Sequence, residues 1–97
     1  MIIKGSEIAE VNYRKGYDIA HLQDQIGHFA ERITTPANPF EPDKHGEQRF
    51  WYILDDSATV TIDGESTQVG PADLVVLAPW TDHSLRADHW VRWVCFG

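Results

Sequence analysis

Residues 70–83 carry the most informative pattern in this chain, and they read GPADLVVLAPWTDH. The opening Gly-Pro pair and Asp73 favour a turn, whereas the next four residues are apolar without interruption. A short apolar run between turn signals is typical of a strand that is covered on both faces. Pro79 then introduces another turn before His83. The pattern predicts a turn, a buried strand at residues 74–78, a second turn and a histidine.

The rest of the C-terminal half also has the pattern of β-strands. Residues 47–54, 58–62 and 90–96 are rich in β-branched and aromatic side chains and are separated by turn residues. Asp63 and Gly64 supply the positive φ angles that a two-residue hairpin turn requires. Many short strands with turns between them are the signature of an antiparallel sandwich or barrel, so the sequence predicts an all-β fold.

The N-terminal part fits two descriptions. One helical face would carry the apolar residues Leu22, Ile26, Phe29 and Ile33, which have the spacing of an amphipathic helix. Internal glycines and the lack of a strong helix cap argue against a helix. We therefore expect two more strands, at residues 17–22 and 27–35.

Size and charge limit the classes of protein to consider. A chain of 97 residues buries one core, so a single domain over residues 1–97 is expected. Its hydrophobic content of 42% excludes a disordered chain. Eight Lys and Arg against fifteen Asp and Glu give a net charge of −7, which repels phosphate backbones and anionic membranes. We expect neither a nucleic-acid nor a membrane partner.

The single cysteine and the N-terminal residues indicate the cellular compartment in which the protein is expected. Cys95 has no second cysteine to pair with, which is typical of a protein in a reducing compartment. The first residues lack the apolar stretch of a signal peptide, and no apolar run approaches the roughly 20 residues that cross a bilayer. We expect a cytoplasmic protein that is not exported.

Two of the predicted strands are apolar on both faces. In residues 50–54 and 74–77 the apolar side chains do not alternate with polar ones. A half-solvated strand would alternate. We expect one of the two faces to meet a second subunit, so that the protein is a homodimer.

A row of alternate residues could form the wall of a site. In an extended strand, side chains two apart share a face, so one face would carry Asp43, His45, Glu47, Arg49, Trp51 and Ile53. This row changes from charged and metal-binding residues at one end to apolar residues at the other. This row is consistent with the wall of a pocket that has a solvent-exposed opening and an apolar base. It is equally consistent with an edge strand that faces solvent.

Two stretches of the sequence, residues 43–56 and 70–83, together resemble the two conserved motifs of the cupin family. Residues 70–83 are similar to the second cupin motif, in which His83 matches a metal ligand. Residues 43–56, DKHGEQRFWYILDD, resemble the first motif, and the hairpin at Asp63 and Gly64 is typical of the segment that comes after that motif in the family. The similarity covers about residues 36 to 86. It implies a single-domain cupin, an antiparallel jelly-roll β-barrel with its site inside.

The chain departs from the cupin motifs at several positions. Asp43 falls where the first His would be, Arg49 replaces the usual Glu, and Asp56 replaces the usual Gly. His45 and His83 are retained. Asp43, His45 and His83 could form a set of two histidines and one carboxylate that holds a divalent ion such as Fe, Mn, Ni or Zn and leaves positions open for oxygen or substrate.

A fixed positive charge at Arg49 conflicts with a bare divalent ion in the same pocket. Glu47 could pair with Arg49, or a bulge at Gly46 could aim Gln48 or Glu47 at the metal and turn Arg49 to solvent. Alternatively, no metal is bound, and Arg49 holds a substrate carboxylate or phosphate while the histidines act as hydrogen-bond donors or acid-base groups.

The resemblance leads to two hypotheses about function. In the first, the protein binds a small polar, anionic organic molecule inside the barrel, with a divalent metal and an isomerase, lyase or oxygenase type of activity. Arg49, Gln48 and Glu47 would contact this ligand, and Trp51 could stack on it. In the second, it is a non-catalytic, metal-free module for ligand binding or oligomeric interaction.

The remaining chemically active side chains are interpreted as structural. His21, His28 and His89 have no acidic or cysteine partner at a recognisable spacing. Cys95 lies in an alternating apolar run, and free cysteine is among the most buried residue types, so we interpret it as a structural thiol.

Overall fold

The computed structural model describes residues 3–18 and 26–97. Within these residues the chain forms one 3-10 helix and a series of short strands: η1 (Gly5–Glu7), β1 (Arg14–Gly16), β2 (Phe29–Thr34), β3 (Phe40–Asp43), β4 (Arg49–Asp55), β5 (Ala58–Ile62), β6 (Glu65–Val69), β7 (Leu74–Leu77), β8 (His83–Arg86) and β9 (Val91–Phe96). No helix in this part of the chain is long and apolar enough to span a membrane.

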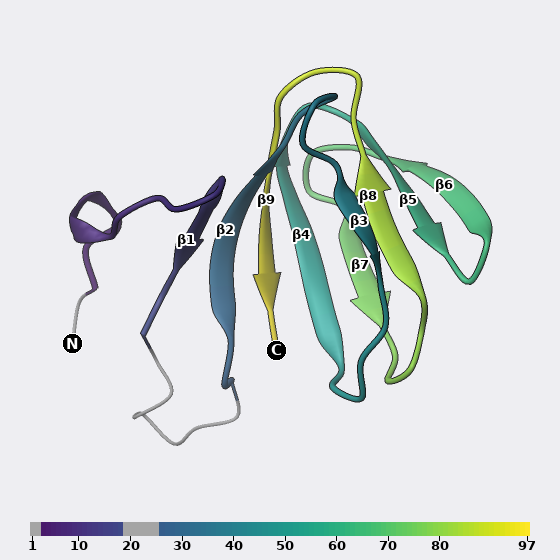
Figure 1. The fold of residues 1–97 in the computed structure, drawn as a ribbon, viewed down its shortest axis with the longest axis horizontal. Helices are drawn as coiled ribbons and strands as arrows, with labels where there is room; N and C mark the ends of the chain where they lie inside the picture. Colours follow the sequence, from purple (N-terminus) through teal and green to yellow (C-terminus); the bar gives the residue numbers. More distant parts are fainter. Residues whose placement is uncertain (1–2, 19–25) are drawn as a thin grey trace.

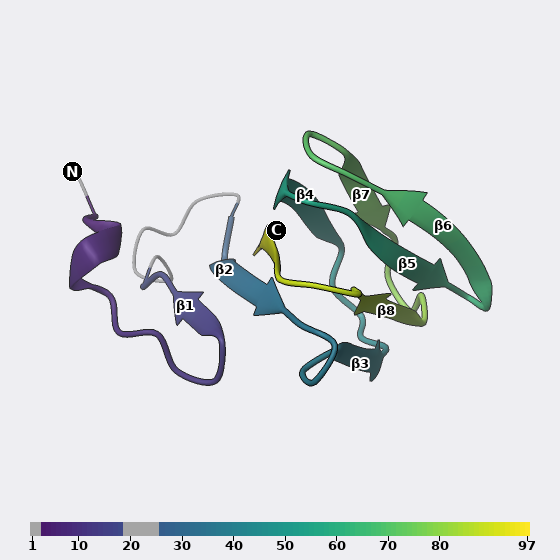
Figure 2. The same cartoon turned by 90° about the horizontal axis from the view of Figure 1, so that it is seen from above.

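The strands form two antiparallel sheets that pack face to face (Figure 1). The first sheet has the order β1-β2-β9-β4-β7, and the second has the order β3-β8-β5-β6. This is an all-β jelly roll, as the sequence predicts, although the two sheets are not closed into one hydrogen-bonded barrel. Seen from above, η1 and β1 extend beyond the edge of the second sheet (Figure 2).

Alternation of side chains places the core between the sheets. Trp51 and Ile53 in β4 and Trp93 in β9 are buried on the inner face of the first sheet. Val60 in β5 and Leu85 in β8 face them from the second sheet. Each strand therefore gives alternate residues to one core, which is the period-two pattern read from the sequence.

The structure confirms the strands predicted in the C-terminal half, with shifts of one or two residues at their ends. Asp63 and Gly64 have φ angles of 48° and 84°, as the predicted hairpin turn requires. The strand predicted at residues 27–35 is present as β2. Of the strand predicted at residues 17–22, Tyr17 and Asp18 lie outside any strand, and the remaining residues lie outside the described part.

The outer face of β4 and β7 in the first sheet is apolar and exposed among the described residues. Side chains that point away from the core on β4 and β7 are 39% to 53% exposed: Tyr52, Leu54, Leu74 and Val76. The strand register pairs Tyr52 with Leu74 and Phe50 with Val76, so these side chains form one continuous patch. The structure therefore leaves this second apolar face of β4 and β7 exposed to solvent among residues 3–18 and 26–97.

Candidate metal and ligand site

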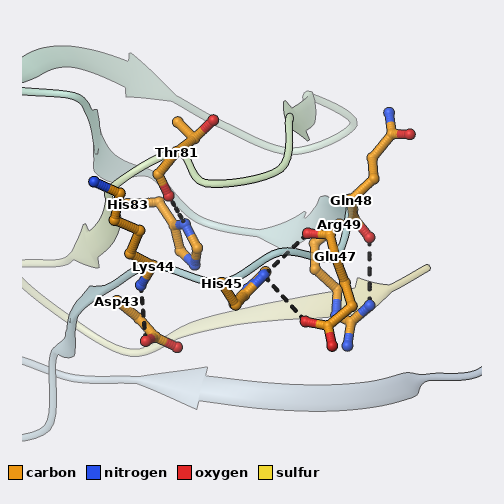
Figure 3. A network of polar contacts seen from close by, with 8 residues as sticks. All are labelled: Asp43, Lys44, His45, Glu47, Gln48, Arg49, Thr81 and His83. Atoms are coloured by element: carbon orange, nitrogen blue, oxygen red, sulfur yellow. Dashed lines mark hydrogen bonds and ion pairs between the residues drawn. The ribbon is translucent and has the colours of Figure 1, made fainter.

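Three of the predicted site residues meet at one end of the jelly roll. Asp43 ends β3 and His83 begins β8, and the register of these two strands pairs them directly. His45 lies in the loop that leads from β3 to β4, with its ring centroid 4.8 Å from that of His83. One potential ligand atom from each of Asp43, His45 and His83 lies within 4.8 Å of the others. Figure 3 shows the three side chains on neighbouring segments.

Hydrogen bonds fix the orientation of both imidazoles. The His83 Nδ1 atom lies 2.8 Å from the carbonyl oxygen of Thr81, and the His45 Nδ1 atom lies 3.0 Å from the carbonyl oxygen of Glu47 (Figure 3). A carbonyl oxygen only accepts, so in each neutral ring Nδ1 carries the proton and donates it. Each ring then keeps the Nε2 lone pair for another partner, which is the tautomer that a metal ligand needs.

The donor set fits a small divalent cation. One oxygen of Asp43 accepts the backbone N–H of Lys44 at 2.8 Å, which leaves the second carboxylate oxygen for a cation. In a tetrahedral or facial set with bonds of about 2.1 Å, the ligand atoms lie about 3.0–3.4 Å apart. Since the three atoms lie within 4.8 Å, a shift of at most about 1.4–1.8 Å would close the set around an ion. Asp43 is exposed, so its side chain can make this shift.

Aromatic rings form an apolar floor beneath the two histidines. His83 is 2% exposed, and its ring lies 5.3 Å from Trp51 and 6.1 Å from Phe40, measured between centroids. Trp51 is 1% exposed and packs 4.7 Å from Trp93. This packing keeps water away from one side of the site and restricts ring rotation.

Backbone contacts tie the two loops of the site together. The N–H of Trp80 donates to the carbonyl of His45 at 2.6 Å, and a side chain at Gly46 would overlap the Trp80 ring. In the same region, the N–H groups of Asp63 and Asp82 each bond to the other residue at 2.9 Å. The positions of His45 and His83 are therefore set by contacts between residues far apart in the sequence.

The interpretation of residues 43–53 as one regular strand is wrong. β3 ends at Asp43 and β4 begins at Arg49, and Gly46 lies in a bend between them, not in a bulge within a strand. The break frees His45 from the strand, so that it can turn toward His83.

Three of the four predicted ligand-contacting residues, Glu47, Gln48 and Arg49, follow His45 in the loop before β4 and at the start of that strand, whereas Trp51 is buried in the core. The Glu47 carboxylate lies 3.5 Å from the His45 Nδ1 atom, whereas Arg49 donates to the carbonyl of Gln48 at 3.3 Å (Figure 3). Gln48 is exposed and points away from the histidines. All three line a hollow of about 640 Å³, together with Ile26, Gly27, Phe50, Phe96 and Gly97.

His28, which the sequence analysis interprets as structural, lies beside this hollow, where its backbone N–H donates to the carbonyl of Gly97 at 3.0 Å. Burial lowers the pKa of His28 to about 4, and the charges of Arg49, Arg14, Arg32 and His45 lower it in the same direction. No spacing in the sequence joins these residues, because they come together only through the strand order β1-β2-β9-β4 of the first sheet. By contrast, Cys95 is buried, and burial raises the pKa of its thiol, as expected for a structural residue.

Comparison with known proteins gives the class of fold. Neither a known sequence family nor a curated protein matches the chain. Among solved structures, a predicted oxalate decarboxylase of Thermotoga maritima is similar with a TM-score of 0.80 and 18% identity, over 99% of this chain and 96% of that one. The protein NMB1881 of Neisseria meningitidis is similar with a TM-score of 0.72 and 13% identity, over 95% and 89% of the two chains.

A larger enzyme contains a similar unit. Salicylate 1,2-dioxygenase of Pseudoaminobacter salicylatoxidans, solved with gentisate, matches with a TM-score of 0.68 and 15% identity, over 73% of this chain and 19% of that one. These structural neighbours are cupin-fold proteins, and the chain has the cupin fold that its motifs resemble. Identities this low establish the fold, and the activity has to be argued from the site.

Proposed function

We propose that this protein is a metal-dependent cupin that binds a small anionic organic molecule between its two sheets and acts on it. The observation that carries the proposal is the arrangement of His45 and His83. Both rings use Nδ1 to bond a backbone carbonyl and keep Nε2 for a metal, and Asp43 adds a carboxylate beside them. Three ligands of this kind leave coordination positions open.

The bound ion would supply Lewis-acid chemistry, or redox chemistry if it is iron or manganese, at those open positions. Asp43, His45 and His83 would hold it, and Trp51 would form the dry floor below the ligand. This chemistry supports an isomerase, lyase or oxygenase reaction of an organic anion. The cupin-fold neighbours named after oxalate decarboxylation and salicylate oxidation are consistent with such a substrate class.

Residues at the mouth would orient the substrate. Arg49 is half-buried and borders the hollow, so its guanidinium is available to a carboxylate or phosphate in fork geometry. Glu47 would hold His45 in the right tautomer, and Gln48 would bond polar groups at the rim. A net charge of −7 over the whole chain supports the absence of a nucleic-acid partner.

We also propose that the protein is a cytoplasmic homodimer. Tyr52, Leu74 and Val76 form an apolar patch that a second copy could cover in an isologous contact. The single free thiol, Cys95, supports a reducing compartment.

Elemental analysis of protein purified without chelators tests the metal. We expect one divalent ion per chain in the natural protein and at least a tenfold loss of metal affinity in His83→Ala. His89→Ala is the matched control, because His89 is paired with Asp56 outside the triad, and it should keep the metal. Metal-free natural protein that still fails to take up Fe, Mn, Ni or Zn on titration would refute the proposal and favour a non-catalytic binding module.

A further inference from the structure

Three of the chain's five arginines share the inner face of the first sheet. Arg32 on β2 is paired with the buried Trp93 on β9 and, on its other side, with Arg14 on β1. Arg49 on β4 is paired with the buried Leu77. Since residues paired across antiparallel strands point to the same face, all three arginines point to the core side.

The side chain of Arg32 lies deep within this side of the molecule. Its Cζ atom is 5.0 Å from the centroid of the Phe40 ring and 5.9 Å from that of Trp93. Its Nε atom is buried and has no hydrogen-bond partner among the described residues. A buried, unpartnered guanidinium N–H is costly, so the site lacks an acceptor that a ligand could provide.

Arg14 is directed along its own strand toward the same region. Its guanidinium lies so close to Gly16 that any side chain at that position would overlap it. Gly16 is itself paired with Ala30, which is fully buried on the inner face. The glycine therefore makes room for the Arg14 guanidinium beside the sheet.

The charges of the three arginines act on common neighbours. After burial, the charges of Arg49, Arg14 and Arg32 are the main causes that lower the pKa of His28. The charges of the same three residues oppose the rise that burial imposes on the pKa of Cys95. Burial lowers the pKa of the Arg32 guanidinium, and the negative charge of Asp43, in the metal triad, raises it. Arg32 also borders the triad through Phe40, whose ring lies 5.0 Å from the Arg32 Cζ atom and 6.1 Å from the His83 ring, measured to centroids.

Arg14 and Arg32 are paired directly across β1 and β2, and paired like charges on adjacent strands destabilise a sheet. Other arginines of the chain have carboxylate partners: Arg86 lies 3.8 Å from Glu41, and Arg92 lies 3.4 Å from Asp55. An acidic protein that keeps three arginines together on an inner face without such ion pairs among its described residues has the charge pattern of an anion site.

We propose that Arg14, Arg32 and Arg49 form an oxyanion-binding subsite beside the metal triad. The inference rests on the proposed function for what it says of the substrate: one group of the substrate approaches the metal, so a second group, a carboxylate or phosphate, is bound by the arginines. The substrate is then an organic acid with at least two anionic groups. Guanidinium forks bind such groups through two parallel hydrogen bonds.

The test measures anion binding to chelator-treated, metal-free protein by calorimetry at low ionic strength, with succinate, acetate and inorganic phosphate as probes. We expect succinate or phosphate to bind at least tenfold more tightly than acetate. Arg32→Met and Arg14→Met should each weaken that binding at least tenfold, and Arg32→Lys should weaken it less. Arg86→Met, which removes a surface arginine, is the matched control and should bind as the natural protein does. Preference for succinate over phosphate identifies a carboxylate, and the reverse identifies a phosphate.

Two further measurements separate this subsite from the metal site. His83→Ala, which cannot hold the metal, should still bind the probe, and Arg32→Met should still bind metal. The probe should raise the melting temperature of the natural protein and leave that of Arg32→Met unchanged, which also shows whether the variant is folded. Absence of binding by every probe, or equal binding by folded Arg32→Met, would overturn the proposal, whatever the outcome of the metal analysis.

Discussion

At the scale of single residues, one buried hydrogen bond joins the side chains of two neighbouring strands, β2 and β9. The Trp93 Nε1–H donates to the Thr34 hydroxyl at 3.0 Å, and both residues are 2% exposed or less. Thr34→Val keeps the shape and removes the acceptor, so we expect a loss of about 1–3 kcal/mol in the free energy of unfolding. Urea denaturation measures it, and Thr34→Ser, which keeps the hydroxyl, should lose about 1 kcal/mol. Equal losses in the two variants would contradict a role for the hydrogen bond.

His28 should make the stability depend on pH. Its pKa of about 4 in the folded protein is lower than the ordinary value of 6.5, because of burial and the charges of Arg49, Arg14, Arg32 and His45. Between these two values the unfolded chain binds a proton that the folded chain does not, so stability is lost as the pH falls from 6.5 to 4.

His28→Asn should therefore flatten the curve of unfolding free energy against pH within this window. An NMR titration of the His28 ring gives its pKa directly. A value near 6.5 would show that the side chain is not in the positive field we describe.

At the scale of elements, the turn before β7 contains an unfavourable residue. Ala72 has a φ angle of 71°, in the left-handed region that costs most residues about 1–2 kcal/mol. Glycine avoids this cost but loses about 0.5–1 kcal/mol through the greater freedom of the unfolded chain. We expect Ala72→Gly to raise the unfolding free energy by up to about 1 kcal/mol and Ala72→Val to lower it, in urea denaturation. A stability loss in Ala72→Gly would contradict this reading of the turn.

Strands with a strong apolar pattern could be predicted from the sequence, and others could not. β4 and β7 contain uninterrupted apolar runs between turn residues, and β5 and β9 are rich in β-branched and aromatic side chains. β3 and β8 are four residues long and β6 is largely exposed, so each of these strands contains few apolar residues and shows no clear hydrophobic pattern in the sequence. The positive φ of 62° at Asp56 explains why the cupin motif has Gly at that position, and Asp tolerates this conformation.

The candidate site was predictable only in part. The motif resemblance identified Asp43, His45 and His83, and the structure brings them together. It could not identify Arg14 and Arg32, because their pairing depends on the register of β1 and β2. The N-terminal sequence fits either a helix or strands, so no register could be assigned there.

At the scale of the whole molecule, the uncovered face of the first sheet should determine the oligomeric state. We expect a dimer in sedimentation equilibrium, because Leu74 and Val76 are each 53% exposed and lie next to Tyr52. Val76→Lys should yield monomers, while Gln68→Lys, on exposed β6 of the other sheet, should remain a dimer. A natural protein that is monomeric at all concentrations would refute the dimer.

We expect Asp43, His45 and His83 to bind one divalent ion through two imidazoles and a carboxylate. Crystals of the metal-loaded protein, measured at the absorption edge of that metal, would locate the ion. One anomalous peak should lie at about 2.0–2.2 Å from Nε2 of His45, Nε2 of His83 and an oxygen of Asp43. A peak bound elsewhere, or histidine rings that are turned so that Nδ1 faces the metal, would contradict it.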